Sequence, residues 1–235
     1  MRKLTAIICL TLTILLGSAG MSASADFQKG LTAYDRGDYA TALREWTPLA
    51  EQGNAYAKTL IGAMYNDGVG VRKNHKTAVK WWKLASVQGL ADAQYNLGAM
   101  YDKGKGVTQD YKTAVKWYRL AAEQGYAIAQ FSLGWMYDDG KGVPQDYKIA
   151  VKWYKLAAKQ GNANAQGNLG VMYAFGTGVL KDYVYAHMWG NIAVTNGNEL
   201  GAKLRDLAAR NMTPSQLEEA QKLARECVRK KYKGC

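Results

Sequence analysis

The chain has 235 residues, with 31 lysines and arginines against 19 aspartates and glutamates, and a formal net charge of +12. A chain of this length could hold two domains, but no Pro/Ser-rich linker or low-complexity segment divides it, so one continuous domain is expected. With only two histidines and three cysteines, the composition leaves few residues for a metal site or for acid–base catalysis.

Residues 1–25 have the pattern of a secretory signal peptide. Arg2 and Lys3 precede an uncharged run from Leu4 to Leu16, and Ala23-Ser24-Ala25 follows. A basic start, a short apolar run and a small-x-small end are typical of a cleaved leader, and the run is short for a membrane span. The alternative is an ordinary buried helix. We expect export to the periplasm or beyond, with no transmembrane segment in the mature chain.

Residues 26–53 have the pattern of a short helical hairpin. Tyr34, Tyr39, Trp46 and Leu49 recur at helical spacing on either side of Gly37, and no Gly-x-Gly insert separates the two predicted helices. The segment is expected to cap the amino-terminal end of the fold.

A 36-residue period organises the chain from Asn54 to Gly197, in four copies at 54–89, 90–125, 126–161 and 162–197. A fixed period of this length is typical of a repeat array, in which each unit buries its apolar face only by stacking on its neighbours. We therefore predict an all-α fold, a right-handed α-solenoid of antiparallel helix pairs. The twelve positions shared by all four copies are, in the second copy, Ala91, Ala93, Gly98, Met100, Tyr101, Gly104, Gly106, Val107, Ala114, Trp117, Ala121 and Gly125.

Each unit contains two predicted helices, A and B. In the second copy, helix A stops at Gly104, which can supply a left-handed residue, and Asp110 can cap helix B, which runs to Gly125. Alanines and the mid-helix Gly98 allow the two helices to approach closely. The aromatic residues expected to supply the large buried area are Tyr101, Trp117 and Tyr118.

The 36-residue period does not continue beyond Gly197. Two further helices are expected, one over Glu199–Asn211 and one from Thr213 to about Lys231, where Thr213, Pro214 and Gln216 form a helix-start signal. Together, residues 198–235 are expected to cap the carboxy-terminal end of the array.

Loss of the leader removes Cys9 and leaves Cys227 and Cys235 in the mature chain. A pair of cysteines in an exported protein favours a disulfide. On one straight helix the two residues would lie roughly 12 Å apart, beyond disulfide reach, so the chain must turn near Gly234. An intramolecular clip of the tail is favoured over two free thiols or an intermolecular bridge.

The repeat unit resembles the Sel1-like repeat (SLR) family, a relative of the tetratricopeptide repeat with a longer loop between its helices. The resemblance covers Asn54–Gly197, whereas residues 26–53 are similar to a plain tetratricopeptide unit. The fourth copy departs most, with Gly190 where an aromatic residue is expected. The residues that carry the resemblance in the second copy are Leu97-Gly98-x-Met100-Tyr101, Gly104-x-Gly106-Val107 and Ala114-x-x-Trp117-Tyr118-x-x-Ala121.

The resemblance implies a scaffold, because members of this family are mostly adaptors and regulators, and exported bacterial members act in the cell envelope. It also implies that helix A lines a concave groove, where a peptide or protein partner would bind. The alternative is that Phe131 and Trp135 only pack against neighbouring helices. The candidate groove residues are Tyr56, Asp92, Tyr95, Asp102, Ile128, Phe131, Trp135 and Asp138.

Nine basic residues occupy three columns of helix B, at spacings that place each trio on one helix face. They form a predicted basic face that would attract acidic proteins, anionic envelope glycans or lipid headgroups; nucleic acid is not expected for an exported chain. The alternative is a solvated face without a partner. The nine are Lys76, Lys80, Lys83, Lys112, Lys116, Arg119, Lys148, Lys152 and Lys155, and a second basic cluster marks the last helix at Lys222, Arg225, Arg229, Lys230, Lys231 and Lys233.

No catalytic constellation emerges. His75 and His187 have no ligand or nucleophile at useful spacing, and the chain lacks the Ser-x-x-Lys motif expected of penicillin-binding relatives. Asp110 and its counterparts one and two periods later recur as helix caps, and Gly104-x-Gly106 is a repeat turn. We expect no enzyme activity, no metal and no cofactor.

Overall fold

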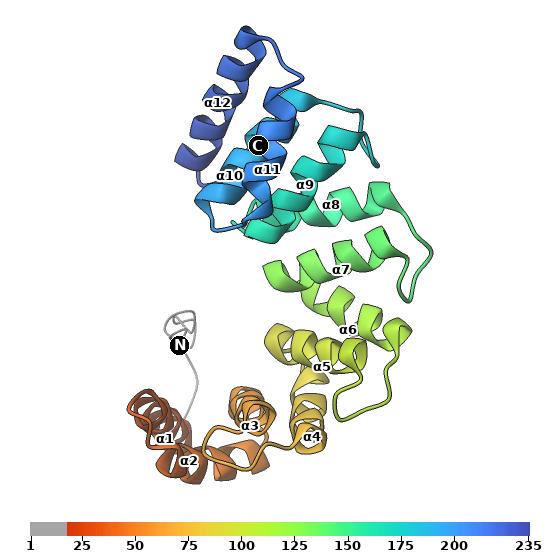
Figure 1. Ribbon diagram of the computed structural model, residues 1–235. Helices are drawn as coiled ribbons and strands as arrows, with labels where there is room; N and C mark the ends of the chain where they lie inside the picture. Colours follow the sequence, from red (N-terminus) through yellow and green to blue (C-terminus); the bar gives the residue numbers. More distant parts are fainter. Residues whose placement is uncertain (1–17) are drawn as a thin grey trace.

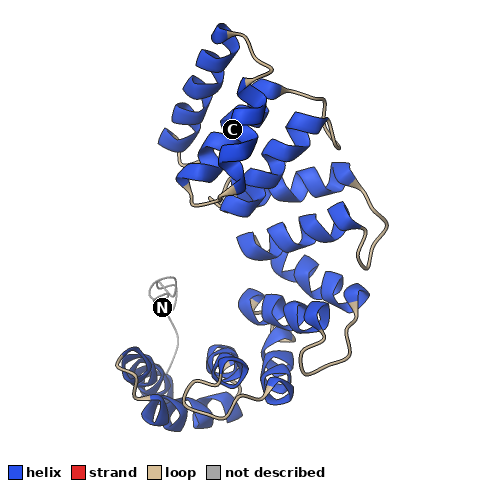
Figure 2. Cartoon of the chain, in the orientation of Figure 1, coloured by secondary structure: helices blue, strands red, loops and turns tan. Residues whose placement is uncertain are grey.

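The computed structural model describes residues 18–235, with side chains from residue 24 onward, and forms them into α-helices without a strand (Figure 1, Figure 2). The helices succeed one another as antiparallel pairs along a curved array, with α1 and α12 at its two ends. The helices are α1 (Ser18–Asp35), α2 (Tyr39–Glu51), α3 (Ala55–Asp67), α4 (His75–Ser86), α5 (Ala91–Lys103), α6 (Tyr111–Glu123), α7 (Ala127–Asp139), α8 (Tyr147–Ala158), α9 (Ala163–Phe175), α10 (Tyr183–Thr195), α11 (Leu200–Ala209) and α12 (Pro214–Arg229).

The predicted all-α solenoid is confirmed, with helices A and B of the four repeats at α3/α4, α5/α6, α7/α8 and α9/α10. Most of the predicted leader lies outside the described residues, and Ser18–Ala25 forms the first part of α1.

Both predicted helix boundaries in the repeat have a clear physical cause. Gly104 ends α5 in the left-handed conformation, with φ of +63°, and its N–H donates to the carbonyl of Met100. The Asp110 carboxylate accepts the N–H of Thr113 at 3.1 Å and so caps the start of α6. The seven-residue span between these two helices is the repeat's long loop, and its second glycine, Gly106, is also left-handed, with φ of +72°.

In the first three repeats the large buried ring lies one position later than the shared tryptophan, whereas in the fourth the shared tryptophan itself, Trp189, is buried. Tyr118 is only 3% exposed, whereas Trp117 and Tyr101 are partly buried. The mid-helix glycine explains the difference, because a Cβ on Gly98 would lie 2.8 Å from the Tyr118 ring. Trp82 and Tyr154 occupy the same place in the flanking repeats. Tyr101 and Trp117 pack against the core while partly exposed, so all three rings contribute buried area as expected, and Tyr118 is the most deeply buried of them.

Buried glutamines connect successive repeats. The Gln130 side chain donates to the carbonyl of Ala122 at 3.1 Å and accepts from Gln160 at 2.8 Å. It therefore ties the end of α6 to the end of α8 through the start of α7. Gln94 and Gln166 make the corresponding bonds one repeat earlier and later. Because the side-chain amide is satisfied on both sides, its burial is not penalised.

The irregular fourth repeat is explained by α11. Gly190, which stands where an aromatic residue was expected, faces Gly201 of α11, and a Cβ on Gly201 would lie 2.6 Å from the Gly190 carbonyl oxygen. Two glycines thus let α10 and α11 approach closely, and Leu204 of α11 is buried beside them.

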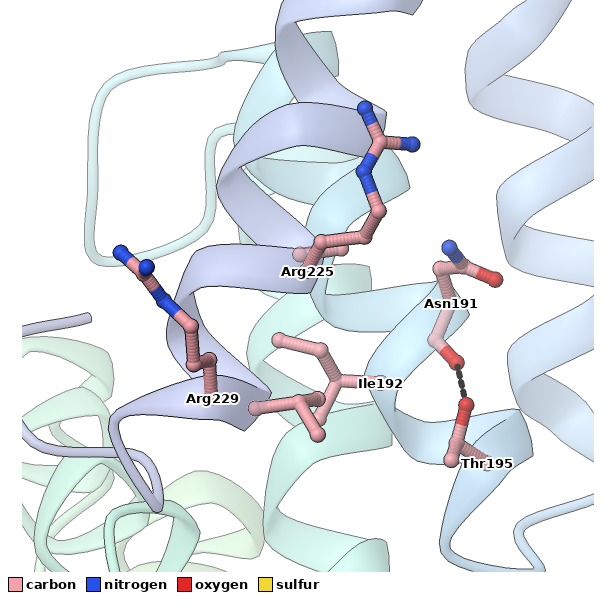
Figure 3. A pocket seen from close by; sticks show the side chains of 7 residues that line it. Asn191, Ile192, Thr195, Arg225 and Arg229 are labelled. Atoms are coloured by element: carbon pink, nitrogen blue, oxygen red, sulfur yellow. Dashed lines mark hydrogen bonds between the residues drawn. The ribbon is translucent and has the colours of Figure 1, made fainter.

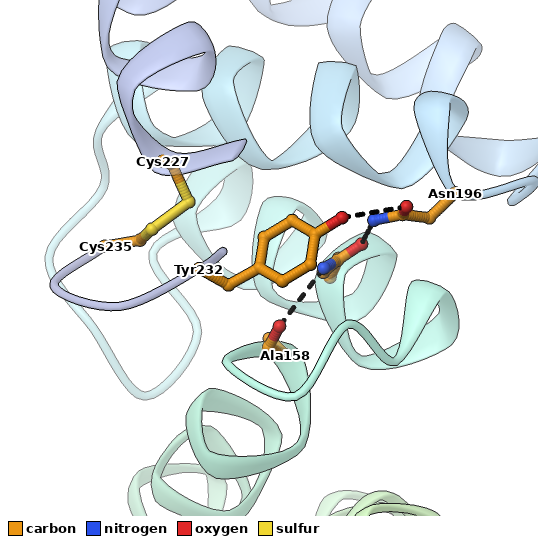
Figure 4. The surroundings of a disulfide bond; sticks show 6 residues. Ala158, Asn196, Cys227, Tyr232 and Cys235 are labelled. Atoms are coloured by element: carbon orange, nitrogen blue, oxygen red, sulfur yellow. Dashed lines mark hydrogen bonds between the residues drawn. A yellow bond between two sulfur atoms is a disulfide. The ribbon is translucent and has the colours of Figure 1, made fainter. Parts of the chain in front are cut away.

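The chain ends in a disulfide clip between Cys227 of α12 and Cys235, whose Cα atoms are 5.5 Å apart (Figure 4). The chain reverses earlier than Gly234, because Lys231 and Tyr232 already have positive φ values of 49° and 64°. The reversal places the Tyr232 hydroxyl where it donates to Asn196 at 2.9 Å. The clip therefore fixes the tail against the end of α10.

Candidate functional site

Three aromatic side chains of the predicted groove, Tyr95, Phe131 and Trp135, remain partly exposed on α5 and α7; we call them the aromatic row. The Tyr95 ring stacks on Tyr118 at a centroid distance of 5.6 Å and lies 5.5 Å from Tyr126. Burial raises the pKa of Tyr95, so its hydroxyl stays neutral. The ring is held by its own repeat and by the start of the next.

Phe131 occupies the same position one repeat later. Its ring centroid lies 5.8 Å from that of Tyr154, the buried ring of the same helix pair. Phe131 packs one side of its ring against Tyr154 and stays partly exposed to solvent. The residue can therefore pack within its repeat and still contact a partner.

Trp135 is covered by a side chain that the repeat pattern did not identify. The ammonium group of Lys141 lies 4.3 Å from the Trp135 ring centroid and forms a 2.6 Å ion pair with Asp139. Asp139 accepts a hydrogen bond from Lys141, which raises the pKa of the lysine, so the lysine is charged. A cation over an indole face is attractive. A ligand at Trp135 must therefore approach its edge or displace Lys141.

The carboxylates of the predicted groove are tied to the buried tyrosines. The Tyr118 hydroxyl donates to Asp102 at 3.3 Å, and the Tyr154 hydroxyl donates to Asp138 at 3.0 Å. Burial raises the pKa of Asp138, although the bond from Tyr154 opposes this. These pairs fix two acidic groups between the aromatic side chains, where they can accept hydrogen bonds or meet a cation.

The remaining groove candidates lie at the edges of this cluster. Ile128 and Asp92 are exposed, and Asp92 hydrogen-bonds Tyr126, whose pKa burial raises. Tyr56 is also exposed, but its ring contacts Phe27 of α1 at 6.4 Å. Tyr56 thus contacts the amino-terminal cap instead of the aromatic row.

The nine residues of the basic face are side chains of α4, α6 and α8, and all except the partly buried Lys155 are exposed. In residues 18–235, none of the nine takes part in a salt bridge. Arg119 donates to the hydroxyl of Tyr137 at 2.6 Å, and Lys155 lies 5.6 Å from the Tyr173 ring. The positive charge of this face is therefore not neutralised within the described part of the chain.

Two hollows lie along the B helices. One, of about 370 Å³, is formed where α12 meets α10, and Ile192, Arg225 and Arg229 are among the residues that line it (Figure 3). The other, of about 580 Å³, lies on the basic face at α6, lined by Leu120 and Lys116 among others. Neither was anticipated from the sequence.

The two histidines lie on different helices, His75 on α4 and His187 on α10. His187 is buried, and burial lowers its pKa, which favours the neutral ring. The Nδ1 of His75 lies 3.1 Å from the Asn66 side-chain oxygen. Within the described residues, no group of three or more histidine, cysteine or acidic side chains could hold a metal. Over the same residues, the helices are too short or too polar to cross a membrane.

A family model described as Sel1 repeat matches residues 55–90, 91–126, 127–162 and 163–198, one residue out of phase with the period read from the sequence. A Sel1 repeat protein from Oxalobacter formigenes has a crystal structure that matches with a TM-score of 0.74 and 33% identity, covering 86% of this chain and 82% of that chain. No curated protein matches the chain.

Two further crystal structures are similar. A protective antigen of uropathogenic Escherichia coli strains, which displays an SLR fold, is 29% identical with a TM-score of 0.59; the match covers 91% of this chain and 56% of that one. An immunity protein of Pseudomonas aeruginosa is 19% identical with a TM-score of 0.51, covering 87% and 81%. The latter likeness shows the fold alone.

Proposed function

The chain belongs to the Sel1 repeat family, and on that premise we propose that it is an exported interaction scaffold of a bacterial cell envelope that binds a peptide or protein at the aromatic row. Sel1 repeat proteins are generally protein-interaction scaffolds. The proposal adds to this general role a compartment and a site. Binding, without catalysis, is the activity proposed.

One observation carries the choice of site. Tyr95, Phe131 and Trp135 are partly exposed aromatic side chains on adjacent repeats, and each is held in place by a ring or a lysine. The equivalent positions of the outer repeats hold small or aliphatic residues such as Thr59 and Gly167. Preorganised aromatic side chains contribute most at interfaces. A partner segment with apolar side chains and a cationic group would suit this row and its carboxylates.

Export is supported by two features. Residues 1–25 have the composition of a cleaved leader, and Cys227 and Cys235 are joined in a disulfide, a bond that persists in oxidising compartments. The similar protective antigen of uropathogenic strains is also consistent with a location that an immune response can reach.

We expect the chain recovered from the periplasm or medium of a bacterial host to begin at Asp26. Amino-terminal sequencing of that material checks the cleavage site, with the cytoplasmic fraction as the control. A chain found only in the cytoplasm with Arg2 still present would contradict export.

Capture experiments test the groove. Residues 26–235 should retain a discrete protein from an envelope fraction, and Phe131→Ala or Trp135→Ala should weaken that capture by about tenfold or more, as loss of an aromatic anchor does. Phe175→Ala, an exposed phenylalanine of α9 outside the row, is the matched control. Helicity measured by circular dichroism should be unchanged. Capture that survives both changes would exclude the row as the site.

A second candidate function is binding of an anionic envelope glycan or surface by the basic face. The specific observation in its favour is that none of the nine basic residues forms a salt bridge within the described chain. In the same capture experiment, a Lys112/Lys116/Arg119→Gln triple variant and a high-salt wash should both release anionic material, because screening weakens such contacts. Retention at high salt would count against this function.

A further inference from the structure

A column of leucines runs through the basic face. Leu84, Leu120 and Leu156 occupy one position of successive B helices and are 51%, 44% and 45% exposed. The same position of the fourth repeat is Ile192, which is 1% exposed. The aliphatic side chain at this position is thus buried in the fourth repeat and exposed in the first three.

The difference is caused by α12, which packs on α10 (Figure 1). The buried residues of α12 are Ala220, Ala224 and Cys227, spaced four and three residues apart on one helix face. Ala224 and Cys227 belong to the same cluster of buried side chains as Met188 and Ile192. The outer face of a B helix is therefore a surface on which an amphipathic helix docks, and the chain itself supplies the example.

The lysine columns change where that docking occurs. Positions held by Lys or Arg in the first three repeats are Val184, Met188 and Asn191 in the fourth. The docked helix α12 has no net charge, because its three basic residues are balanced by three acidic ones. The fourth repeat thus has apolar or neutral residues under a helix without net charge. The first three repeats keep the positive charge, which an acidic helix would complement.

We propose that the outer face of α4, α6 and α8 is a docking site for an acidic amphipathic α-helix of another protein. The hollow on α6 is its centre: Val115, Leu120 and Val143 supply apolar lining, and Lys112, Lys116 and Arg119 supply charge. The partner helix lays its apolar stripe along the leucine column and pairs its carboxylates with the basic side chains.

The two alternative occupants fit less well. A second copy of the chain carries a net charge of +12 and the same basic outer face, so face-to-face pairing would bring like charges together. An anionic glycan or lipid headgroup would account for the lysines but would leave the leucine column uncovered. The combination of exposed leucine and basic residues in register is what favours an acidic helix.

The test uses the full chain and a synthetic acidic amphipathic peptide of about 20 residues, long enough to form a helix, with leucines at i, i+3, i+4 and i+7 and glutamates elsewhere. A scrambled peptide of the same composition is the ligand control. Binding is followed by fluorescence anisotropy at low salt. The amphipathic peptide should bind, and the scrambled one should not.

Two variants separate the apolar contribution to peptide binding from the electrostatic one. Leu120→Asn with Leu156→Asn should weaken binding about tenfold or more, because two buried leucine contacts are lost. Leu180→Asn, at a leucine 89% exposed in the loop before α10, is the matched control and should bind normally. The Lys112/Lys116/Arg119→Gln triple should weaken binding at low salt and less so at high salt. Circular dichroism confirms that each variant is folded.

Several results would overturn the proposal: no binding of the amphipathic peptide, equal binding of the scrambled peptide, or no effect of the leucine pair. Binding to vesicles that contain phosphatidylglycerol is measured as well. If the basic triple weakens the binding of both vesicles and peptide, and the leucine pair weakens neither, the face is a general binder of anionic surfaces. Because the aromatic row lies on α5 and α7, failure here leaves the groove function intact, and the capture experiment tests that function separately.

Discussion

Replacing Gly142 by alanine is expected to lower the free energy of unfolding by about 2–5 kcal/mol. Gly142 has φ of +72°, and a Cβ there would fall against the carbonyl group of Tyr111 and 2.8 Å from the backbone nitrogen of Lys112. The left-handed conformation costs an L-residue about 1–2 kcal/mol, and overpacking adds about 1–3 kcal/mol. Backbone atoms cannot rotate away as a side chain could, so the clash is not easily relieved.

Gly125→Ala is the matched control. Gly125 also has a positive φ, of +87°, but a Cβ there would meet nothing within 4 Å. It should therefore show only the conformational cost, about 1–2 kcal/mol. Urea denaturation of both variants measures the difference. Equal losses would show that the approach of Gly142 to Tyr111 contributes nothing to stability.

The position of Gly142 predicts how the variant unfolds. It lies in the loop of the third repeat and packs on the start of α6 in the second. Stability in a repeat array is a sum of unit and nearest-neighbour terms, so a weakened internal interface allows the two sides to unfold separately. We expect the urea transition to broaden or split in Gly142→Ala. A single sharp transition at the wild-type midpoint would contradict this.

The sequence predicts the helix boundaries well because they depend on local chemistry. A left-handed glycine and a capping aspartate act within a few residues of themselves, and Gly104 and Asp110 do in the structure what their residue types predict. The capping box at Thr213 and Gln216 is equally local, and it begins α12 as expected. A period of 36 residues then fixes the order of the pairs, and the family and solenoid follow.

Contacts that depend on the third dimension were not predictable in this way. Which of two adjacent aromatic residues is more deeply buried depends on helix rotation. Trp117 and Tyr118 were therefore expected to be buried alike, although only Tyr118 fills the space above Gly98. The contact of Lys141 with Trp135 joins a loop residue to helix A of the same unit, and nothing in the repeat pattern marks it. The docking of α12 on α10 brings together residues about one repeat length apart, although the loss of lysine at Met188 was a visible signal.

The groove was predicted as columns of helix A, and the structure shows which side chains of these columns are packed and which are exposed. Phe131 was weighed between packing and binding, and the structure shows it in contact with Tyr154 while still partly exposed. The carboxylates of Asp102 and Asp138 were expected only to lie nearby. Their bonds to Tyr118 and Tyr154 could not be read from spacing, because they join helix A to helix B across sixteen residues.

Removal of the disulfide is the second change with a large expected effect. A Cys227→Ala/Cys235→Ala variant should lose about 2–3 kcal/mol of stability, the loop-closure estimate for a bridge across so few residues. The separation of the two cysteines is eight residues. Alanine is chosen because Cys227 is buried beside Ala224, where a serine hydroxyl would lack a partner. Urea denaturation with and without dithiothreitol provides an independent measurement on the unmodified chain.

The loss should concentrate at the carboxy-terminal cap. The clip holds Tyr232, whose hydroxyl donates to Asn196, and the Asn196 amide in turn donates to Gln166 at 2.8 Å. Gln166 donates to the carbonyl of Ala158, so this chain of bonds runs from the tail to the end of α8 (Figure 4). Hydrogen exchange should rise first in α12 and the last turn of α10 when the bridge is absent. Uniform exchange along the array would contradict that order.

Tyr232→Phe distinguishes the clip from the hydrogen bond that it positions. This variant keeps the disulfide and the ring, which would lie 3.2 Å from a Cβ on Gly161, and loses only the bond to Asn196, a cost of about 1 kcal/mol. If the cysteine variant costs no more than Tyr232→Phe, the bridge adds nothing beyond holding one hydroxyl. If it costs more and dithiothreitol reproduces the difference, the closed cap depends on an oxidising environment. The stability of this end of the scaffold would then be linked to the export proposed for the chain.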